Sequence, residues 1–158
     1  STATPRMEIS SAGIVTCRNV PSFLISIDSL NDTGNNAIII SEDNGFTLSA
    51  TGRNAHNFGG HFNEADGKFT APVEGLYFFG FSVMRSSSSG SGSIDLRIKK
   101  NASLMMARTY RVGYTSQFES HNVQTITRML AGHYITFHLG ANMSVYEDDS
   151  YMFGYLIG

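Results

Sequence analysis

The sequence predicts an all-β domain, a β-sandwich or jelly roll, on the basis of three observations. Apolar residues recur with a period of two, as they do in strands, and no segment has a convincing helical period. Turn sequences such as DNG at residues 43–45 and ADG at residues 65–67 separate these segments at regular intervals. The chain of 158 residues suits one domain, and no linker rich in proline and glycine divides it. Many short strands without helices are typical of sandwiches and jelly rolls.

Two predicted strands have a clear buried face. Large apolar side chains alternate with polar, charged or tyrosine side chains in residues 94–99 and 134–139, the pattern of a strand with one face in the core. Further strands are predicted at residues 22–27, 37–40, 46–50, 61–62, 68–70, 75–83, 105–110, 123–129 and 152–157. The first 18 residues are predicted to be irregular, and the serine-rich residues 86–93 are predicted to be a mobile surface loop.

The segment DGKFTAPVEGLYFFGF, residues 66–81, predicts a strand that has no polar face. Every position from Leu76 to Phe81 carries an aromatic or aliphatic side chain or a glycine. An ordinary half-exposed strand would carry a polar residue at every second position. Something other than water must therefore cover the second face of this strand.

The composition argues against several classes of partner. Charged residues make up 15% of the chain, against about 25% in a typical protein, and the net charge is −2 without any basic cluster. We therefore expect no nucleic-acid partner and no binding to anionic membranes. No apolar run approaches the roughly 18 residues of a membrane span, so we expect no membrane insertion. A low charge content fits an extracellular protein that hides part of its surface in an oligomer.

The sequence gives no indication of an enzyme. It lacks GxSxG, HExxH, the P-loop and GxGxxG, the common motifs of hydrolases, metalloproteases and nucleotide-binding proteins. His56 and His61 have a spacing loosely like that of metal ligands, but a polar loop before a hairpin is the favoured interpretation. His133 and His138 are five residues apart on one predicted strand, so their side chains face opposite ways and do not share a metal.

The acidic run Glu147, Asp148 and Asp149 is the one candidate for a metal site. Calcium takes several oxygen ligands, and three carboxylates in a loop could supply them. The favoured interpretation is a solvated loop, because that is the usual state of a charge run. We therefore expect no required cofactor, and calcium binding stays open as the alternative.

One segment mixes aromatic and polar residues in the manner of a carbohydrate-binding site. Sugars bind with an aromatic ring against their CH face and with Arg, Asn, Gln or carboxylate groups on their hydroxyls. Because the chain has no Trp, tyrosine would supply the ring. The competing interpretation is an ordinary strand–loop–strand surface. The candidate residues are Arg108, Tyr110, Arg111, Tyr114, Gln117, Glu119, His121 and Asn122.

Cys17 is the only cysteine, which excludes an intrachain disulfide and a thiolate metal cluster. We expect a buried thiol, with an intermolecular link near the N-terminus as the alternative. Three N-glycosylation sequons begin at Asn31, Asn101 and Asn142, where about two are expected by chance.

Residues 57–81 resemble the globular head domain of complement C1q, a family allied to the tumour-necrosis-factor ligands. The likeness extends over residues 20–158, because residues 96–101 are similar to the strand that ends in Lys-Asn and residues 154–157 are similar to the closing Gly-aromatic-Leu-Ile. Thr51 departs from the pattern where Phe is usual, and His133 departs from it where Asp is usual. The characteristic spacing is met by Asn57, Phe62, Phe69, Gly75, Tyr77, Phe79 and Phe81.

The resemblance implies a ten-stranded jelly roll that assembles as a compact homotrimer. One face of the strand at residues 75–83 would then pack in the core, and the other would face neighbouring subunits. Residues 1–19 form an N-terminal extension with neither a heptad nor a Gly-X-Y repeat, so residues 20–158 would be a stand-alone head without the stalk used in complement activation. The residues assigned to core and trimer contacts are Tyr77, Phe79, Phe81 and Tyr155.

The resemblance also implies secretion and a role in recognition. Stand-alone heads of invertebrate type often act in innate immunity as lectins for polysaccharides or microbial surface glycans. Three copies of a weak site that bind together raise avidity by about 10²–10⁴. We therefore predict a secreted, lectin-like pattern-recognition homotrimer that binds carbohydrate. The alternative is a trimeric extracellular ligand for a protein receptor.

Overall fold

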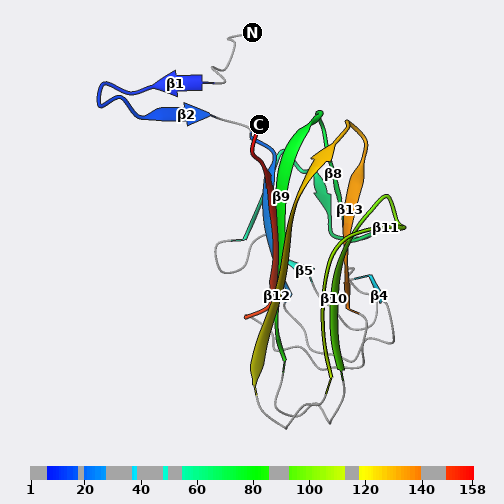
Figure 1. Ribbon diagram of the computed structural model, residues 1–158. Helices are drawn as coiled ribbons and strands as arrows, with labels where there is room; N and C mark the ends of the chain where they lie inside the picture. The colour runs from blue at the N-terminus through cyan, green and yellow to red at the C-terminus, as the bar shows by residue number, and fades with distance from the viewer. Residues whose placement is uncertain are drawn as a thin grey trace.

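The computed structural model describes residues 7–17, 20–27, 37–38, 48–49, 55–85, 93–112, 118–139 and 149–158. These residues form two antiparallel sheets that stack face to face, together with a separate hairpin (Figure 1). They contain no helix, and therefore none long and apolar enough to cross a membrane. The predicted all-β jelly-roll sandwich is confirmed.

The first sheet has the strand order β12-β9-β14-β3-β5, and β6 pairs with β3 beside it. Its strands are β3 (Ser22–Ile27), β5 (Leu48–Ser49), β6 (His56–Phe58), β9 (Gly75–Arg85), β12 (Glu119–Met129) and β14 (Tyr151–Leu156). The second sheet has the order β11-β10-β13-β8-β7, and β4 pairs with β13. Its strands are β4 (Ala37–Ile38), β7 (Phe62–Asn63), β8 (Lys68–Thr70), β10 (Ser93–Lys100), β11 (Leu104–Val112) and β13 (Tyr134–Leu139). Among the described residues the two sheets together hold twelve strands, six in each, where the resemblance implied ten, because the short strands β4 and β6 add one pairing to each sheet.

The core lies between the sheets, and six of the nineteen buried apolar residues described in it are phenylalanines. Phe23 of β3 stacks on Phe62 and Phe69, with ring centroids 4.9 and 5.0 Å apart. Phe69 also meets Phe79 edge to face at 5.5 Å. Ring pairs with these geometries contribute free energy to the fold in addition to the hydrophobic free energy of the area that they bury. The other buried apolar residues are Ile25, Ile27, Ala71, Tyr77, Phe81, Val83, Ile94, Leu96, Ile98, Val123, Met129, Ile135, Phe137, Leu139 and Met152.

Strand β9 directs alternate aromatic residues into this core. Tyr77, Phe79 and Phe81 are fully buried, so all three are core residues. The Tyr77 hydroxyl donates a hydrogen bond to the carbonyl oxygen of Val73 at 2.9 Å. Burial raises the pKa of the Tyr77 hydroxyl above its ordinary value. The intervening residues of β9 lie on the outward face of the first sheet.

Aromatic rings lie against glycines where β9 pairs with β14. In this ladder Gly80 is opposite Phe153, and Gly154 is opposite Phe79. A Cβ atom added at Gly80 would lie 2.2 Å from Cζ of Phe153, and one added at Gly154 would lie 2.4 Å from Cδ1 of Phe79. Because neighbouring positions along a strand face opposite ways, the two glycines make room for a ring on each side of the sheet.

Strand β13 is buried on both faces, whereas its sequence predicted one buried face. Thr136 and His138, which point away from the core, are only 1% and 5% exposed. Oγ1 of Thr136 and Nε2 of His138 are hydrogen-bonded at 2.9 Å. In the ladder Thr136 lies between Lys68 of β8 and Lys99 of β10, whose long side chains share its face and can cover it.

Residues 7–17 form a hairpin of β1 (Met7–Ile9) and β2 (Val15–Cys17), although the sequence predicted no regular structure there. Strands of three residues are too short for a period of two to be recognised. The hairpin stands away from both sheets in Figure 1. Cys17 is exposed, so the expectation of a buried thiol is wrong: this hairpin lies against no core that could bury it.

Other predicted strands are present with shifted boundaries. Strand β9 continues to Arg85, and β12 begins at Glu119, because the pairing of these two strands extends beyond their apolar positions. Residues His56–Phe58, predicted as a polar loop, form β6 and pair with β3. Residues 86–92 of the predicted serine-rich loop lie outside the described residues, and Ser93 begins β10.

Replacing Gly154 with alanine tests the ring-against-glycine packing. The added methyl group would collide with Phe79 and Phe23, both of which are buried and have no room to move. We expect Gly154→Ala to lower the free energy of unfolding by about 1–3 kcal/mol, measured by urea denaturation. Gly158→Ala is the control, because a Cβ atom there meets nothing within 4 Å. Equal stability of the two variants would contradict this packing.

Candidate functional site

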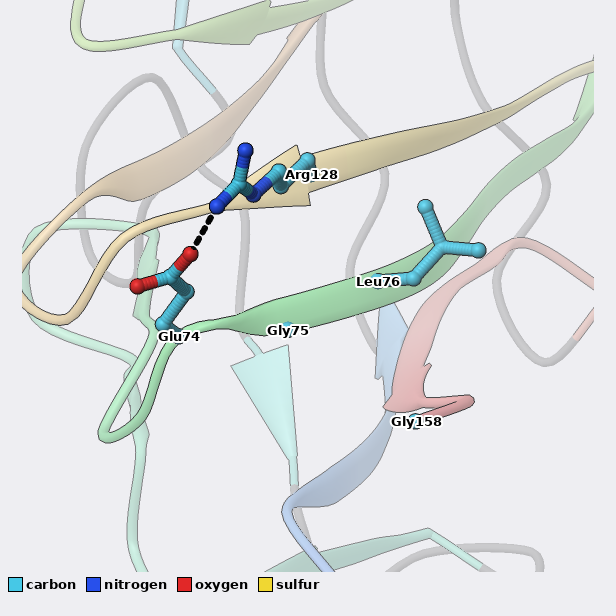
Figure 2. A pocket seen from close by; sticks show the side chains of 5 residues that line it. All are labelled: Glu74, Gly75, Leu76, Arg128 and Gly158. Atoms are coloured by element: carbon cyan, nitrogen blue, oxygen red, sulfur yellow. Dashed lines mark hydrogen bonds and ion pairs between the residues drawn. The ribbon is translucent and has the colours of Figure 1, made fainter.

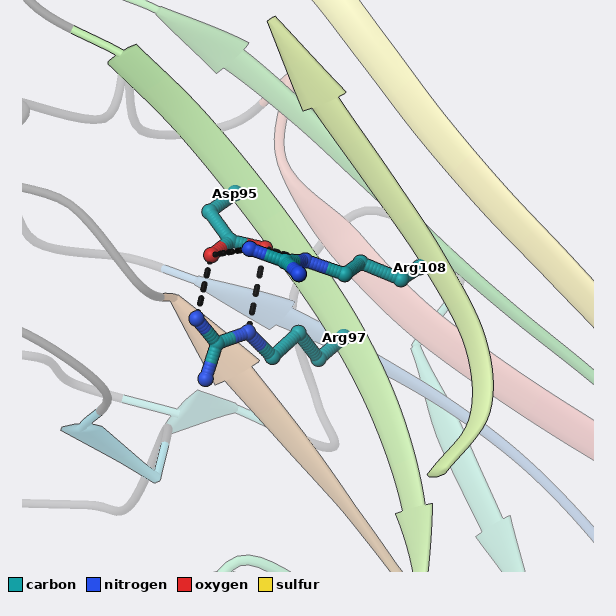
Figure 3. Close-up of polar contacts among 3 residues, drawn as sticks. All are labelled: Asp95, Arg97 and Arg108. Carbon is teal, nitrogen blue, oxygen red and sulfur yellow. Dashed lines mark hydrogen bonds and ion pairs between the residues drawn. The ribbon is translucent and has the colours of Figure 1, made fainter.

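Asp95 organises the outward face of the second sheet. It is 2% exposed, yet it lies on the face of β10 that points away from the core. Nε of Arg108, on β11, donates to Oδ1 of Asp95 at 2.8 Å, and Nη2 donates to Oδ2 at 2.8 Å. Arg97 donates to the same two oxygens, from Nε at 3.0 Å and from Nη2 (Figure 3). One carboxylate thus fixes the positions of two guanidinium groups.

The Asp95 carboxyl is held in its charged form. Burial by itself would raise its pKa, but the hydrogen bonds and positive charges of Arg108 and Arg97 outweigh burial and lower the pKa below its ordinary value. The hydrogen bond to Asp95 raises the pKa of Arg108 in turn. One negative charge therefore faces two positive charges, and the group of Asp95, Arg97 and Arg108 has a net positive charge.

Tyr110 places an exposed aromatic ring beside this group. It is opposite Asp95 in the β10–β11 ladder and is 56% exposed. The guanidinium carbon of Arg108 lies 5.0 Å from the centroid of the Tyr110 ring, a cation–π contact. Two N–H groups of Arg108 donate to Asp95, and its side chain is 46% exposed. An aromatic surface and hydrogen-bond donors thus meet in a place that solvent reaches.

Arg111, Glu119 and His121 form a second polar cluster. Nη1 of Arg111 donates to Oε2 of Glu119 at 3.1 Å, and Nε2 of His121 lies 3.4 Å from the same oxygen. Arg111 is on β11 of the second sheet, whereas Glu119 and His121 are on β12 of the first sheet. This cluster therefore links the edges of the two sheets.

The eight residues predicted to bind carbohydrate are brought together only in part. Arg108 and Tyr110 share the outward face of the second sheet, and the cluster around Glu119 joins the sheet edges. Asn122 is exposed on the outward side of β12, in the other layer. Tyr114 and Gln117 lie outside the described residues.

The sequence interpretation missed Asp95 and Arg97, which hold Arg108 in place. Both had been assigned only as the polar alternates of a strand. Their spacing of two residues puts them on one face of β10, and this is the signal that could have found them. Their contact with Arg108 depends on the register between β10 and β11, which the sequence does not display.

The other candidates form no metal site within the described segments, where no three His, Cys, Asp or Glu side chains come close enough to hold an ion. Nδ1 of His133 accepts a hydrogen bond from the amide of Leu130 at 3.2 Å. Asp149 is exposed, and the other two members of its acidic run, Glu147 and Asp148, lie outside the described residues.

One of the three sequons lies in a described turn. Asn101 is exposed between β10 and β11, and its Oδ1 accepts a hydrogen bond from the amide of Tyr134 at 3.1 Å. Asn31 and Asn142 lie outside the described residues.

Part of the outward face of the first sheet is apolar and exposed. Leu76 is 42% exposed, Ile126 is 56% exposed and Tyr155 is 45% exposed. The ring centroid of Phe78 lies 5.6 Å from that of Phe153 and 5.5 Å from that of Tyr155. A contiguous exposed apolar patch is characteristic of an interaction surface. We call this patch the apolar face and define it as Leu76, Phe78, Ile126, Tyr151, Phe153 and Tyr155.

A groove of about 570 Å³ adjoins the apolar face at Leu76 (Figure 2). Glu74 and Arg128 form an ion pair beside it. Its remaining lining comes from Gly75 and Gly158, which add no side chain. Two of the three side chains in its lining are charged and paired with each other, so the groove meets the apolar face only at Leu76.

The chain belongs to the C1q domain family, because the family model of the C1q domain matches residues 46–157. Its fold is similar to that of the globular domain of zebrafish complement 1qA protein, with a TM-score of 0.59 and 17% sequence identity over 87% of this chain and 98% of that chain. At this identity the similarity shows the fold alone. No curated protein matches the sequence. C1q-domain proteins are generally extracellular, form trimers and are typically non-enzymatic.

Removing the charge of Asp95 should destabilise the domain in a pH-dependent way. The folded state lowers the pKa of Asp95, so its stabilisation is present above pH ~4 and is lost as the pH falls through the folded-state pKa. We expect Asp95→Asn to lower the free energy of unfolding by about 2 kcal/mol at neutral pH, with a smaller loss in acid. Urea denaturation at both pH values measures the difference.

Asp66→Asn is the matched control. Asp66 pairs with Lys68 at 3.0 Å, but the two side chains are 41% and 35% exposed, so its loss should cost less than about 1 kcal/mol. If Asp95→Asn is no more destabilising than Asp66→Asn, Asp95 does not hold the two arginines as described.

Proposed function

We propose that this protein is a secreted homotrimeric recognition protein that binds polysaccharides or microbial surface glycans multivalently, without enzymatic activity. One observation carries this proposal: the apolar face and the Tyr110 surface lie on opposite layers of the sandwich. Assembly through one layer leaves the other layer open to a ligand.

The apolar face supports assembly into a trimer. Its aromatic and aliphatic side chains would remain in water in a monomer, and the hydrophobic effect favours covering them with neighbouring copies. Closed threefold symmetry covers this face on every subunit with one repeated interface. Family membership supports the same state, because C1q-domain proteins form trimers.

The surroundings of Tyr110 support carbohydrate binding. Its exposed ring offers an apolar surface to the CH face of a sugar, and Arg108 offers N–H donors to hydroxyl oxygens. Because Asp95 holds Arg108 in place, less side-chain entropy is lost when a ligand binds. A single site of this kind is weak, and three copies in a trimer raise the avidity by about 10²–10⁴.

Tyr155→Asp tests assembly through the apolar face. A carboxylate in the middle of a subunit interface is costly to bury, so we expect a folded monomer. Sedimentation velocity measures the mass, and circular dichroism confirms that the variant is folded. Tyr110→Asp is the control, because the same substitution on the other layer should leave the trimer intact. A Tyr155→Asp variant that remains trimeric contradicts the proposed interface.

Tyr110→Ala tests the binding surface. Loss of the ring should weaken binding of the trimer to immobilised polysaccharide by about tenfold per site, because the stacked contact is removed. Surface plasmon resonance with soluble polysaccharide as competitor measures this loss. Leu104→Ala, at a residue 54% exposed near the far end of the same strand, is the control.

A trimer that binds none of a panel of neutral and acidic glycans would contradict the carbohydrate proposal. One tight protein partner without inhibition by glycans would then favour the alternative, a ligand for a cell-surface receptor.

A further inference from the structure

Basic side chains that are far apart in the sequence meet on the outward face of the second sheet. The ladder places Lys68 of β8 and Lys99 of β10 on either side of Thr136. Two residues before Lys99 and on the same face of β10, Arg97 lies opposite Arg108 of β11. With strands about 4.8 Å apart and alternate residues about 7 Å apart, four cationic groups occupy two adjacent rows of the sheet. We call this set, Lys68, Arg97, Lys99 and Arg108, the basic array.

Among the described residues, the carboxylates paired with the basic array are fewer than its cations. Asp66 pairs with Lys68 at 3.0 Å, and Asp95 is shared by Arg97 and Arg108. Within the described part of the chain, no carboxylate pairs with Lys99. Counted over the described residues, four cations therefore face two carboxylates, although the net charge of the whole chain is −2. A local excess on a protein of opposite net charge marks a place where an anion is favoured.

An aromatic ring lies at each end of the basic array. Nζ of Lys68 lies 5.5 Å from the centroid of the Tyr134 ring, and the guanidinium of Arg108 lies 5.0 Å from that of Tyr110. An acidic sugar residue presents both features that this surface matches: an anionic group for the cations and an apolar CH face for the rings. Duplex nucleic acid fits less well, because its binding commonly uses six to ten phosphate contacts, about twice what this array supplies.

We propose that the basic array, flanked by Tyr110 and Tyr134, binds acidic polysaccharide carrying carboxylate or sulfate groups. This proposal rests on the proposed carbohydrate-binding function and names its ligand class. Arg97 and Arg108 are positioned by Asp95, whereas Lys68 and Lys99 contact the anionic groups along the chain of sugars. Because the array lies on the layer opposite the apolar face, each subunit of a trimer presents one copy.

The first experiment compares dextran sulfate with dextran of the same length, so that charge is the only difference between the ligands. We expect the trimer to bind dextran sulfate at least about tenfold more tightly, and this preference should fall as sodium chloride rises from about 0.05 to 0.3 M. Surface plasmon resonance on the intact trimer measures both effects.

The second experiment uses two neighbouring lysines on opposite sides of one strand. Lys99 belongs to the array, whereas Lys100 points to the other side and donates from Nζ to the carbonyl oxygen of Arg128 at 2.8 Å. Both Lys99→Gln and Lys100→Gln change the net charge by the same amount. We expect Lys99→Gln to weaken binding of dextran sulfate by about threefold, the double variant with Lys68→Gln by about tenfold, and Lys100→Gln to have no effect.

Each outcome decides one question, provided that sedimentation velocity shows every variant to be trimeric. Equal losses in Lys99→Gln and Lys100→Gln would show that bulk charge acts rather than the array, and would overturn the proposal. Equal affinity for dextran and dextran sulfate would overturn the acidic ligand class but leave carbohydrate binding standing. Duplex DNA that competes as strongly as dextran sulfate would overturn the assignment to polysaccharide. Failure to bind any glycan would overturn the proposed function itself.

Discussion

Strand β9 has apolar side chains on both faces, and the arrangement of the whole domain depends on this constraint. Its inward rings complete the aromatic core, with Phe79 packed edge to face against Phe69 of the opposite sheet. Its outward residues leave the first sheet with rings and aliphatic groups in contact with solvent. A strand with apolar side chains on both faces favours cover on both sides. The second sheet covers one side, and the apolar side chains of the other side are exposed in the single chain.

A buried charged group lies on the outward face of the second sheet. Asp95 lies between two arginines there, and its buried carboxylate is tolerable only because four hydrogen bonds satisfy it. That arrangement fixes Arg108 against Tyr110. The nearby side chains of Lys68 and Lys99 are partly exposed to solvent. The two layers therefore differ in chemical character while sharing one core.

The sequence predicted the fold because the period of two and the spacing of aromatic residues are local signals. Tyr77 and Phe79 are core residues, and the family is the one that their motif indicated. The site was predicted less well, because strand pairing decides which residues meet. Lys68 and Lys99 are about thirty positions apart and become neighbours only through β13. The eight candidates formed a nearly continuous segment, but alternation along the strands sends their side chains to different layers. Exposure of Cys17 depended on a short hairpin that periodicity does not detect.

The alternation of ring and glycine between β9 and β14 also has a consequence for how the domain folds. Strand β14 lies between β3 and β9, and both of these precede it in the chain. The ribosome therefore makes both neighbours before the strand that joins them, and the two ladders of β14 cannot form until β14 has been made. Formation of the sheet then requires contacts between distant segments, which is a slow process. A shift of one residue would place Phe153 beside Phe79 and leave a ring with no glycine to accommodate it. The two glycines thus favour a single register of β14, because only in that register does each ring lie opposite a residue without a side chain.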